Sequence, residues 1–272
     1  DDIDLIVAAG EIFGVVGPDG AGKTTLMQLF AAILDPSGGR CRVLGRDSIR
    51  EAAAINAEVG YLSQGFTLYD RLTVEENLTF AARIRDVSPE AYGQRRRALL
   101  AMAGLEPFIG RRAGRLSGGM RKKLSLCTAL IHEPPLLLLD ELSLGVDPIS
   151  RRELWKLLYR FREGGTTVVL TTAYMDEALW CDRIALLQNG RVERSGTPQR
   201  LLAALQGRVF QAETRQATEA LAILGPAPEV QQAHPTASNV RILTRPGQAL
   251  RPATLASIER LGAVAPVAPT LE

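Results

Sequence analysis

The chain has 272 residues, enough for one large domain or for one domain with a small second one. Apolar residues make up 46% of it, and 32 basic against 30 acidic residues leave a net charge of +2, which by itself argues neither for nor against a nucleic-acid partner. No apolar run approaches the roughly 20 residues that a membrane-spanning helix needs. Cys41, Cys127 and Cys181 form no CxxC pair, so we expect free thiols rather than a disulfide framework.

Residues 1–200 alternate short β-rich runs with helical patterns, which predicts an α/β fold. In chain order we expect strand 11–17, helix 23–34, strands 40–45 and 59–64, helices 73–85, 88–104 and 119–131, strand 136–140, helix 148–162, strand 166–172, a further helix, and a hairpin over 183–196. The runs LLLLD and TTVVLTT are continuously apolar or β-branched. Such strands are typical of a parallel sheet that helices cover on both faces.

From about residue 207 the composition changes, because alanine, proline and glutamine become more frequent and no phosphate-binding motif occurs. We expect strand 208–213, helix 216–224, strands 229–233 and 239–244, helix 252–261 and strand 263–268. This β-α-β-β-α-β order predicts a small ferredoxin-like appendix of the α+β class. We therefore divide the chain into a domain of residues 1–206 and an appendix of residues 207–272.

The stretch GPDGAGKTT fits the pattern G-x-x-x-x-G-K-[ST] between a strand and a helix, which is the context of a phosphate-binding P-loop. Its candidate nucleotide-binding residues are Gly17, Pro18, Asp19, Gly20, Ala21, Gly22, Lys23, Thr24 and Thr25. The glycines let successive N–H groups point at phosphate oxygens, and the helix N-terminus adds partial positive charge. Lys23 can reach the β- and γ-phosphates, and the Thr24 hydroxyl can ligate Mg²⁺. The alternative is a glycine-rich turn with a chance lysine.

The run LLLLDE is an apolar strand that ends in Asp140 and Glu141. Carboxylates at the carboxyl end of a parallel strand lie where α/β folds bind ligands. We expect Asp140 to hold Mg²⁺ through water, and Glu141 to orient and deprotonate the attacking water. The alternative is that the two acids only cap the next element, and the P-loop makes that interpretation weaker.

The stretch LSGGM opens the helix expected at 119–131 and offers a second helix N-terminus suited to phosphate. Its residues are Leu116, Ser117, Gly118, Gly119 and Met120. The alternative is an ordinary serine N-cap. One nucleotide does not need two phosphate sites in one chain, whereas two chains facing head to tail would use each site once.

Together these motifs resemble the ATP-binding cassette (ABC) ATPases over roughly residues 1–205. The order is the P-loop, Gln64 after a strand, LSGGM, LLLLDE and then Asp147. The words GEIFGVVGPDGAGKTTL, SLGVDPISRRELW and YMDEA resemble bacterial drug-export cassettes, which serve ABC-2 type permeases. The resemblance implies the P-loop NTPase fold of the ABC ATPases, with a helical subdomain at about 65–130 beside the α+β appendix.

In that family two cassettes enclose two ATP molecules, so the resemblance implies a dimer in which the LSGGM signature acts on the partner's ATP. It implies Glu141, Gln64 and Lys23 as catalytic residues. It implies Thr24, Gln64 and Asp140 as the residues that hold Mg²⁺. Asp147 would lie in the loop that crosses the dimer interface.

The function that the resemblance implies is hydrolysis of Mg-ATP on the cytoplasmic side of the cell membrane, powering a permease that exports drugs or other small molecules. A subgroup that joins two cassettes in one chain is also similar, with this chain as the first cassette, and the start at Asp1 without a methionine agrees with a piece of a longer protein. A regulatory module that binds ATP but hydrolyses it slowly stays open. So does a cassette of translation or DNA maintenance, although no heptad run separates Gln64 from Ser117 and we expect no nucleic-acid partner.

Three positions depart from the family pattern. Met120 stands where glutamine is usual, beyond the serine and the glycines, so we expect little effect. Leu142 stands where proline is usual and removes a constraint on φ just after Glu141. Ala173 stands where the family has a histidine that contacts the γ-phosphate and the attacking water.

A methyl group cannot donate a hydrogen bond, so Ala173 is a degenerate switch position. Losing one positioned donor to a transition-state oxyanion typically costs about 10²–10³ in rate. The two histidines of the chain, His132 and His234, lie in other segments, and Thr172 and Tyr174 are the neighbouring donors that could compensate in part. The sequence therefore predicts an intact ATP site that turns over slowly.

Overall fold

The structure is a computed structural model, and it describes residues 2–65, 68–236 and 238–269. The remaining residues of the predicted helical subdomain and appendix, 66–67, 237 and 270–272, lie outside the described part. The chain divides into two compact units, Asp1–Thr197 and Pro198–Glu272. The predicted border at residues 206 and 207 stays a prediction. In the described part no helix is both long enough and apolar enough to cross a membrane.

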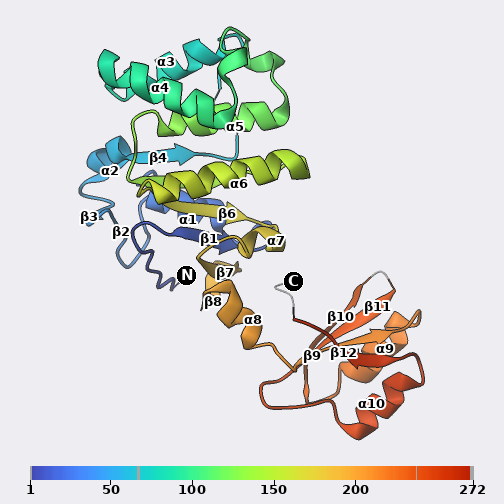
Figure 1. Cartoon of the computed structure of the whole chain (residues 1–272). Coiled ribbons are helices and arrows are strands. Elements are labelled where there is room, and N and C mark those ends of the chain that lie inside the picture. Colours follow the sequence, from blue (N-terminus) through green and yellow to red (C-terminus); the bar gives the residue numbers. More distant parts are fainter. Residues whose placement is uncertain (1, 66–67, 237, 270–272) are drawn as a thin grey trace. The chain divides into compact units, whose positions relative to one another are not determined.

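The first unit is built on a six-stranded sheet in the order β4-β5-β6-β1-β7-β8 (Figure 1). Its strands are β1 (Ile12–Val16), β4 (Val59–Leu62), β5 (Leu136–Asp140), β6 (Thr167–Thr172), β7 (Arg183–Gln188) and β8 (Arg191–Gly196). The first five of these are parallel, and β8 returns antiparallel to β7. Asn189 and Gly190 between them both have positive φ, as a tight type I′ turn requires, so the predicted hairpin is confirmed.

Helices cover both faces of this sheet, because successive residues of a buried strand point in opposite directions. On β6, Val169 packs in a core cluster with Met27 of α1 (Lys23–Phe30). The next residue, Leu170, faces an apolar cavity lined by Leu154 of α6 (Pro148–Glu163). The α/β fold with a parallel sheet is therefore confirmed.

Three helices form a layer beyond the β4 edge of the sheet. They are α3 (Val74–Ile84), α4 (Pro89–Ala103) and α5 (Gly118–Leu130), with two short 3₁₀ turns, η1 (Glu106–Phe108) and η2 (Ala113–Arg115), before α5. Figure 1 shows α5 next to β4, with α3 and α4 stacked on its far side. This arrangement lies within the helical subdomain that was predicted from the sequence.

The segment between α1 and β4 differs from the prediction. Helix α1 ends at Phe30 instead of residue 34, because Ala32 has a φ of 51° and the N–H groups of Ile33 and Leu34 turn back to the carbonyl of Gln28. The strand expected at 40–45 shrinks to a small hairpin. It consists of β2 (Arg42–Val43) and β3 (Arg46–Asp47), and the helix α2 (Ala52–Glu58), which follows it, was not predicted. A further short helix, α7 (Met175–Ala178), follows β6 as expected.

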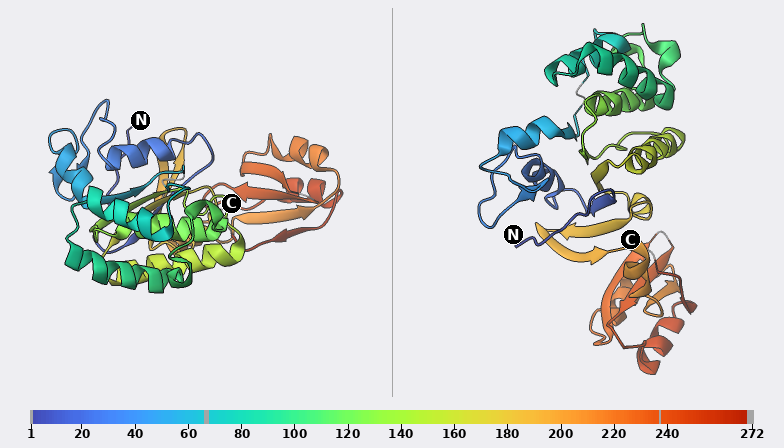
Figure 2. Two further views of the ribbon diagram at one scale, coloured as in Figure 1. Left: turned by 90° about the horizontal axis from the view of Figure 1, so that it is seen from above. Right: turned by 60° about the vertical axis from the view of Figure 1, so that its left-hand side comes forward.

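The second unit begins with α8 (Pro198–Ala203) and contains a four-stranded antiparallel sheet in the order β10-β11-β9-β12. Its elements are β9 (Val209–Glu213), α9 (Ala217–Leu224), β10 (Val230–Thr236), β11 (Asn239–Thr244), α10 (Pro252–Glu259) and β12 (Val264–Pro266). Buried residues of the sheet, such as Val240 and Ile242, pack with Leu224 of α9 and Ile258 of α10 in a separate core. Both views in Figure 2 show this unit, and its β-α-β-β-α-β order confirms the ferredoxin-like prediction.

Candidate nucleotide-binding site

The candidate site lies where four neighbouring parallel strands end. Strands β4, β5, β6 and β1 are adjacent in the sheet, so their carboxyl ends meet at one edge. The P-loop follows β1, Gln64 follows β4, Asp140 ends β5 and Thr172 ends β6. In open α/β sheets this edge is where ligands bind.

The P-loop joins β1 to α1 through a tightly curled backbone. Gly17 lies so close to β7 that an added Cβ would be 2.1 Å from the carbonyl oxygen of Leu187. No side chain caps the first turn of α1, and its N-cap residue, Gly22, has a left-handed φ of 101°. The first N–H groups of the helix thus have no side-chain acceptor, which is the arrangement that binds phosphate at helix N-termini.

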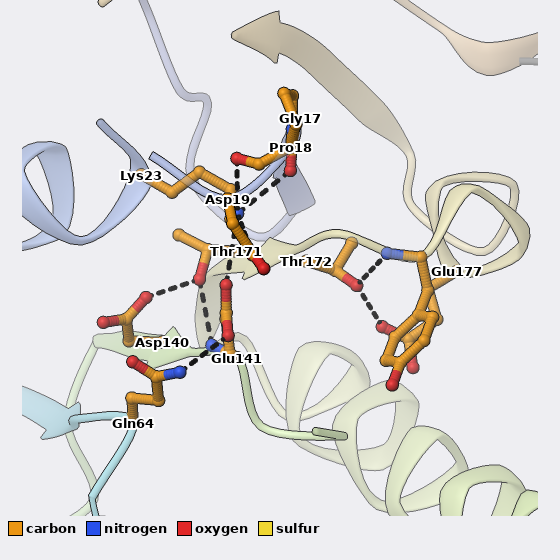
Figure 3. Close-up of polar contacts among 11 residues, drawn as sticks. Gly17, Pro18, Asp19, Lys23, Gln64, Asp140, Glu141, Thr171, Thr172 and Glu177 are labelled. Atoms are coloured by element: carbon orange, nitrogen blue, oxygen red, sulfur yellow. Dashed lines mark hydrogen bonds and ion pairs between the residues drawn. The ribbon is translucent and has the colours of Figure 1, made fainter. Parts of the chain in front are cut away.

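The ammonium group of Lys23 is buried inside this loop, with 4% of the side chain exposed. It donates hydrogen bonds to the carbonyl oxygens of Gly17, at 2.9 Å, and Pro18, at 3.1 Å (Figure 3). It also pairs with the carboxylate of Glu141, whose Oε1 lies 3.1 Å from Nζ. Asp19, at 3.9 Å, is 95% exposed, and such a contact in water contributes little. Lys23 is therefore held in the loop with Glu141 as its main counterion.

Glu141 is fixed from three sides. Its Oε2 accepts a hydrogen bond from the Gln64 side-chain amide at 2.9 Å, and its backbone N–H donates to the Thr171 hydroxyl at 2.9 Å. The same hydroxyl donates to Oδ1 of Asp140 at 2.6 Å. The structure thus brings together four predicted site residues, Lys23, Gln64, Asp140 and Glu141, around a threonine that the sequence analysis passed over.

Lys122 of α5 is a second buried cation that sequence reasoning missed. Burial lowers its pKa below the ordinary lysine value, and the negative charge of Glu141 opposes that shift. A lysine in the second turn of an amphipathic helix carries no local sequence signal. Thr171 could have been found from the sequence, because it belongs to the pair of threonines at the carboxyl end of the strand TTVVLTT, where ligands bind.

The oxygen groups of the site fit a magnesium ion. Oδ2 of Asp140 is buried and has no hydrogen-bond partner among the described residues, which is what an acceptor reserved for a metal-bound water would show. Within the same described ranges there is no cluster of three histidine, cysteine or acidic side chains that could enclose a metal by itself. Mg²⁺ commonly keeps several waters and substrate phosphate oxygens and takes only one or two protein ligands, so both observations agree with it.

The signature residues contact a different part of the unit. The Ser117 hydroxyl accepts a hydrogen bond from the N–H of Met120 at 3.3 Å. Ser117 therefore caps α5, as the alternative of a serine N-cap predicted. Its O–H proton stays available to a phosphate. Gly119 packs against α6, because an added Cβ would lie 2.4 Å from the Ser150 hydroxyl. The placement of Leu116–Met120 at a partner's nucleotide stays a prediction.

Asp147 caps the N-terminus of α6. Its Oδ1 accepts hydrogen bonds from the N–H groups of Ile149, at 3.1 Å, and Ser150, at 3.0 Å. The Ser150 backbone and then its hydroxyl hold the pKa of Asp147 below the ordinary aspartate value. The loop before α6 therefore ends in a fixed negative charge next to the helix that carries the signature.

The degenerate switch position, Ala173, lies just past the end of β6. Thr172 is buried, and its hydroxyl donates to Oε2 of Glu177 at 2.7 Å while it accepts the N–H of Tyr174 at 3.0 Å. The Tyr174 ring lies under the guanidinium of Arg151, 4.4 Å from its carbon. The Thr172 hydroxyl is thus engaged with Glu177, and the ring of Tyr174 is held by Arg151.

The fold and the site define a P-loop nucleotide-binding protein of the α/β class. Comparison with known proteins makes this more specific, since the family described as "ABC transporter" matches residues 1–143. The probable multidrug ABC transporter ATP-binding protein YbhF of Escherichia coli (strain K12) is 46% identical over 208 residues, which are 76% of this chain and 36% of that protein. The daunorubicin resistance ATP-binding protein DrrA3 of Streptomyces coeruleorubidus is 40% identical over 208 residues, 76% of this chain and 66% of that protein.

A solved structure agrees with these relatives. A dimeric ATP-binding cassette in a post-hydrolysis state, bound to ADP and Pi, superposes with a TM-score of 0.64 at 28% identity and covers 71% of this chain and 88% of that one. The chain belongs to the ABC transporter family and has the fold of its ATP-binding cassettes. It spans only part of the curated relatives that it matches, about a third of the Escherichia coli protein.

Proposed function

We propose that this chain binds Mg-ATP in a head-to-tail cassette dimer and hydrolyses it to drive a membrane permease. The observation that carries the proposal is the cluster at the strand ends, in which Lys23 faces Glu141 and Glu141 is oriented by Gln64 and Thr171. A buried lysine in a P-loop and an oriented carboxylate beside it are the two groups that phosphoryl transfer to water requires.

The chemistry follows from these contacts. The γ-phosphate of ATP takes the place of the Glu141 carboxylate as the counterion of Lys23, which frees Glu141 to accept a proton from water. The water oxygen forms a bond to the γ-phosphorus while the bond from that phosphorus to the β–γ bridging oxygen breaks, giving ADP and phosphate. Gln64, which already donates to Glu141, holds the water in line.

Thr24, Gln64 and Asp140 are the residues that would hold Mg²⁺. When bound, the ion would supply positive charge that stabilises the phosphate groups of ATP. Oδ2 of Asp140 has no hydrogen-bond partner among the described residues, while Thr171 orients its other oxygen. Thr24 is exposed on the first turn of α1, where its hydroxyl can point at a ligand in the P-loop.

The wider role rests on similarity and on the sequence. The relatives are named as multidrug and daunorubicin resistance ATP-binding proteins, which supports a drug or small-molecule export system and favours a motor over a regulatory module. The partners that we propose are a second cassette and an ABC-2 type permease, on the cytoplasmic side of the cell membrane. The 208 aligned residues make up 36% of the Escherichia coli relative, so most of that protein lies outside the match, and this supports a parent chain with a second cassette.

Single-turnover hydrolysis tests the proposal. Glu141→Gln keeps the size of the side chain but removes the base, so we expect nucleotide binding to persist while the hydrolysis rate falls by about 10²–10⁴. Lys23→Ala is expected to weaken ATP binding itself. Glu163→Gln is the matched control, because it makes the same change at an exposed residue at the end of α6 that belongs to none of the motifs. A Glu141→Gln rate equal to that of the unchanged chain would refute the enzyme assignment.

A further inference from the structure

Arg151, in the first turn of α6, joins this helix to the segment that follows β6. Its Nη1 lies 3.3 Å from Oδ2 of Asp176, and its Nε lies 3.6 Å from Oε1 of Glu177. The face of the same guanidinium stacks on the Tyr174 ring. One side chain thus contacts three of the five residues after Thr172, and it belongs to the helix that Asp147 caps.

Glu177 is the buried end of this connection, with 1% of the residue exposed. Its Oε2 accepts the Thr172 hydroxyl, whereas its Oε1 has no hydrogen bond among the described residues and faces Arg151. At 3.6 Å the contact with Arg151 is an ion pair rather than a hydrogen bond. A buried carboxylate without a cation nearby is strongly destabilised, and Arg151 is the cation that faces Glu177.

The backbone at Ala173 is held between these groups. Before it, the Thr172 hydroxyl donates to the Glu177 carboxylate. After it, the Tyr174 N–H donates to the Thr172 hydroxyl, and the Tyr174 ring packs on the Arg151 guanidinium. Figure 3 shows Thr172 and Glu177 beside the cluster of Lys23 and Glu141. The arrangement fixes where a side chain at position 173 points.

We propose that Arg151 and Glu177 are positioning residues for the γ-phosphate end of the site. Together they hold the backbone of the switch position, Ala173, in place. They also connect it to the loop that ends at Asp147, because the Arg151 N–H donates to the Asp147 carbonyl one helical turn earlier, at 2.9 Å. The inference deepens the proposed function and rests on it. An ion pair that only stabilises the fold would leave the geometry at position 173 unaffected.

Amide hydrogen exchange in the full chain tests the geometry without requiring any hydrolysis. Arg151→Lys keeps the charge but removes the planar fork that contacts all three residues, and Glu177→Gln keeps an acceptor for Thr172 but removes the ion pair. We expect exchange at the amides of Ala173 and Tyr174 to rise about tenfold in either variant. Arg162→Lys is the matched control, because Arg162 lies on the same helix, pairs with Asp182 at 2.8 Å and stacks over Tyr159.

The second arm uses the histidine that the chain lacks. Ala173→His is expected to raise the single-turnover rate by up to about 10²-fold, because it restores a donor to the γ-phosphate. If Arg151 positions that side chain, the gain in rate must shrink in the Arg151→Lys background. It must stay unchanged in the Arg162→Lys background, since the rate factors of independent substitutions multiply. ATP affinity should remain within about twofold in Arg151→Lys and in Arg162→Lys, because neither residue belongs to the P-loop.

The outcomes separate the two proposals. Absence of hydrolysis in the unchanged chain and in Ala173→His would refute the proposed function, while exchange at residues 173 and 174 would still decide the positioning role. Unchanged exchange there in both Arg151→Lys and Glu177→Gln overturns the inference, and so does an equal histidine gain in the Arg151→Lys and Arg162→Lys backgrounds. Glu177→Gln supplies the result if Arg151→Lys fails to melt cooperatively.

Discussion

Glu141 combines a chemical role with an unusual backbone. Its φ is 50°, a left-handed conformation that costs a residue with a side chain about 1–3 kcal/mol and survives only where the surroundings enforce it. The N–H bond to Thr171 and the contacts of the carboxylate to Lys23 and Gln64 supply that enforcement. Leu142, which stands where proline is usual, is buried and lines the same small apolar cavity as Leu154 and Leu170.

At His132 the structure predicts a dependence of stability on pH. Burial lowers the pKa of its imidazole from 6.5 to about 4, and the charge of Arg85 acts in the same direction. The unfolded chain therefore binds more protons than the folded chain between these values, and the free energy of unfolding must decrease as the pH falls from about 6.5 toward 4. From about pH 7 to about pH 5 we expect a loss on the order of 1 kcal/mol from this residue, after discounting for solvent screening.

Urea denaturation of the chain and of His132→Gln at both pH values measures this loss. The variant removes the titrating group, so its stability should decrease less over the same interval. Identical pH dependence in the two proteins would show that the imidazole is not restricted to its neutral form in the folded state.

At the scale of single elements, helix α3 begins with a complete capping box. The Thr73 hydroxyl accepts the N–H of Glu76 at 3.1 Å, and the Glu76 carboxylate accepts the N–H of Thr73 at 2.7 Å. We expect Thr73→Ala to lower the free energy of unfolding by about 1 kcal/mol, because one orphan N–H of the first turn loses its acceptor. Thr73→Ser retains the hydroxyl and should stay close to the unchanged chain in a urea titration. Equal losses in both variants would point to the methyl group rather than the cap.

The elements also show why some predictions succeeded. The helices expected at 73–85 and 88–104 and the hairpin expected at 183–196 are present. Their signals are local, because Thr73 and Ser88 cap the helices and Asn189-Gly190 makes the turn within a few residues. Helix α1 was predicted too long because its end depends on Ala32, an alanine with positive φ that no sequence rule favours. In the site, the motif residues were predictable. Thr171 bonds to the Glu141 N–H only because β5 pairs with β6, and Lys122 feels the charge of Glu141 only because of how α5 packs; both residues are distant from Glu141 in the sequence.

At the scale of the whole molecule, the described residues include a hydrophobic cluster on the six-stranded sheet and a separate cluster around the four-stranded sheet. Gly262, just before β12, offers a way to disturb the second core alone. An added Cβ there would lie 1.8 Å from the carbonyl oxygen of Glu213, a backbone atom that cannot move aside without breaking the pairing of β9. Gly262→Ala is therefore expected to destabilise the second unit by more than about 2 kcal/mol.

Limited proteolysis and ATP binding together report on this prediction. Cleavage should increase within residues 209–266, while the first unit keeps its resistance and its affinity for ATP. A parallel loss of ATP binding would mean that the two units do not fold independently.

The Thr171 hydroxyl has a consequence for folding fidelity. It contacts both Asp140 and the backbone of Glu141 because β5 and β6 pair with Asp140 opposite Thr171. A slip of one residue between these strands would turn that hydroxyl to the other face of the sheet and leave both acids without their shared partner. Only correctly paired molecules then offer the complete ligand site, so we expect bound nucleotide to stabilise the native sheet relative to misaligned ones.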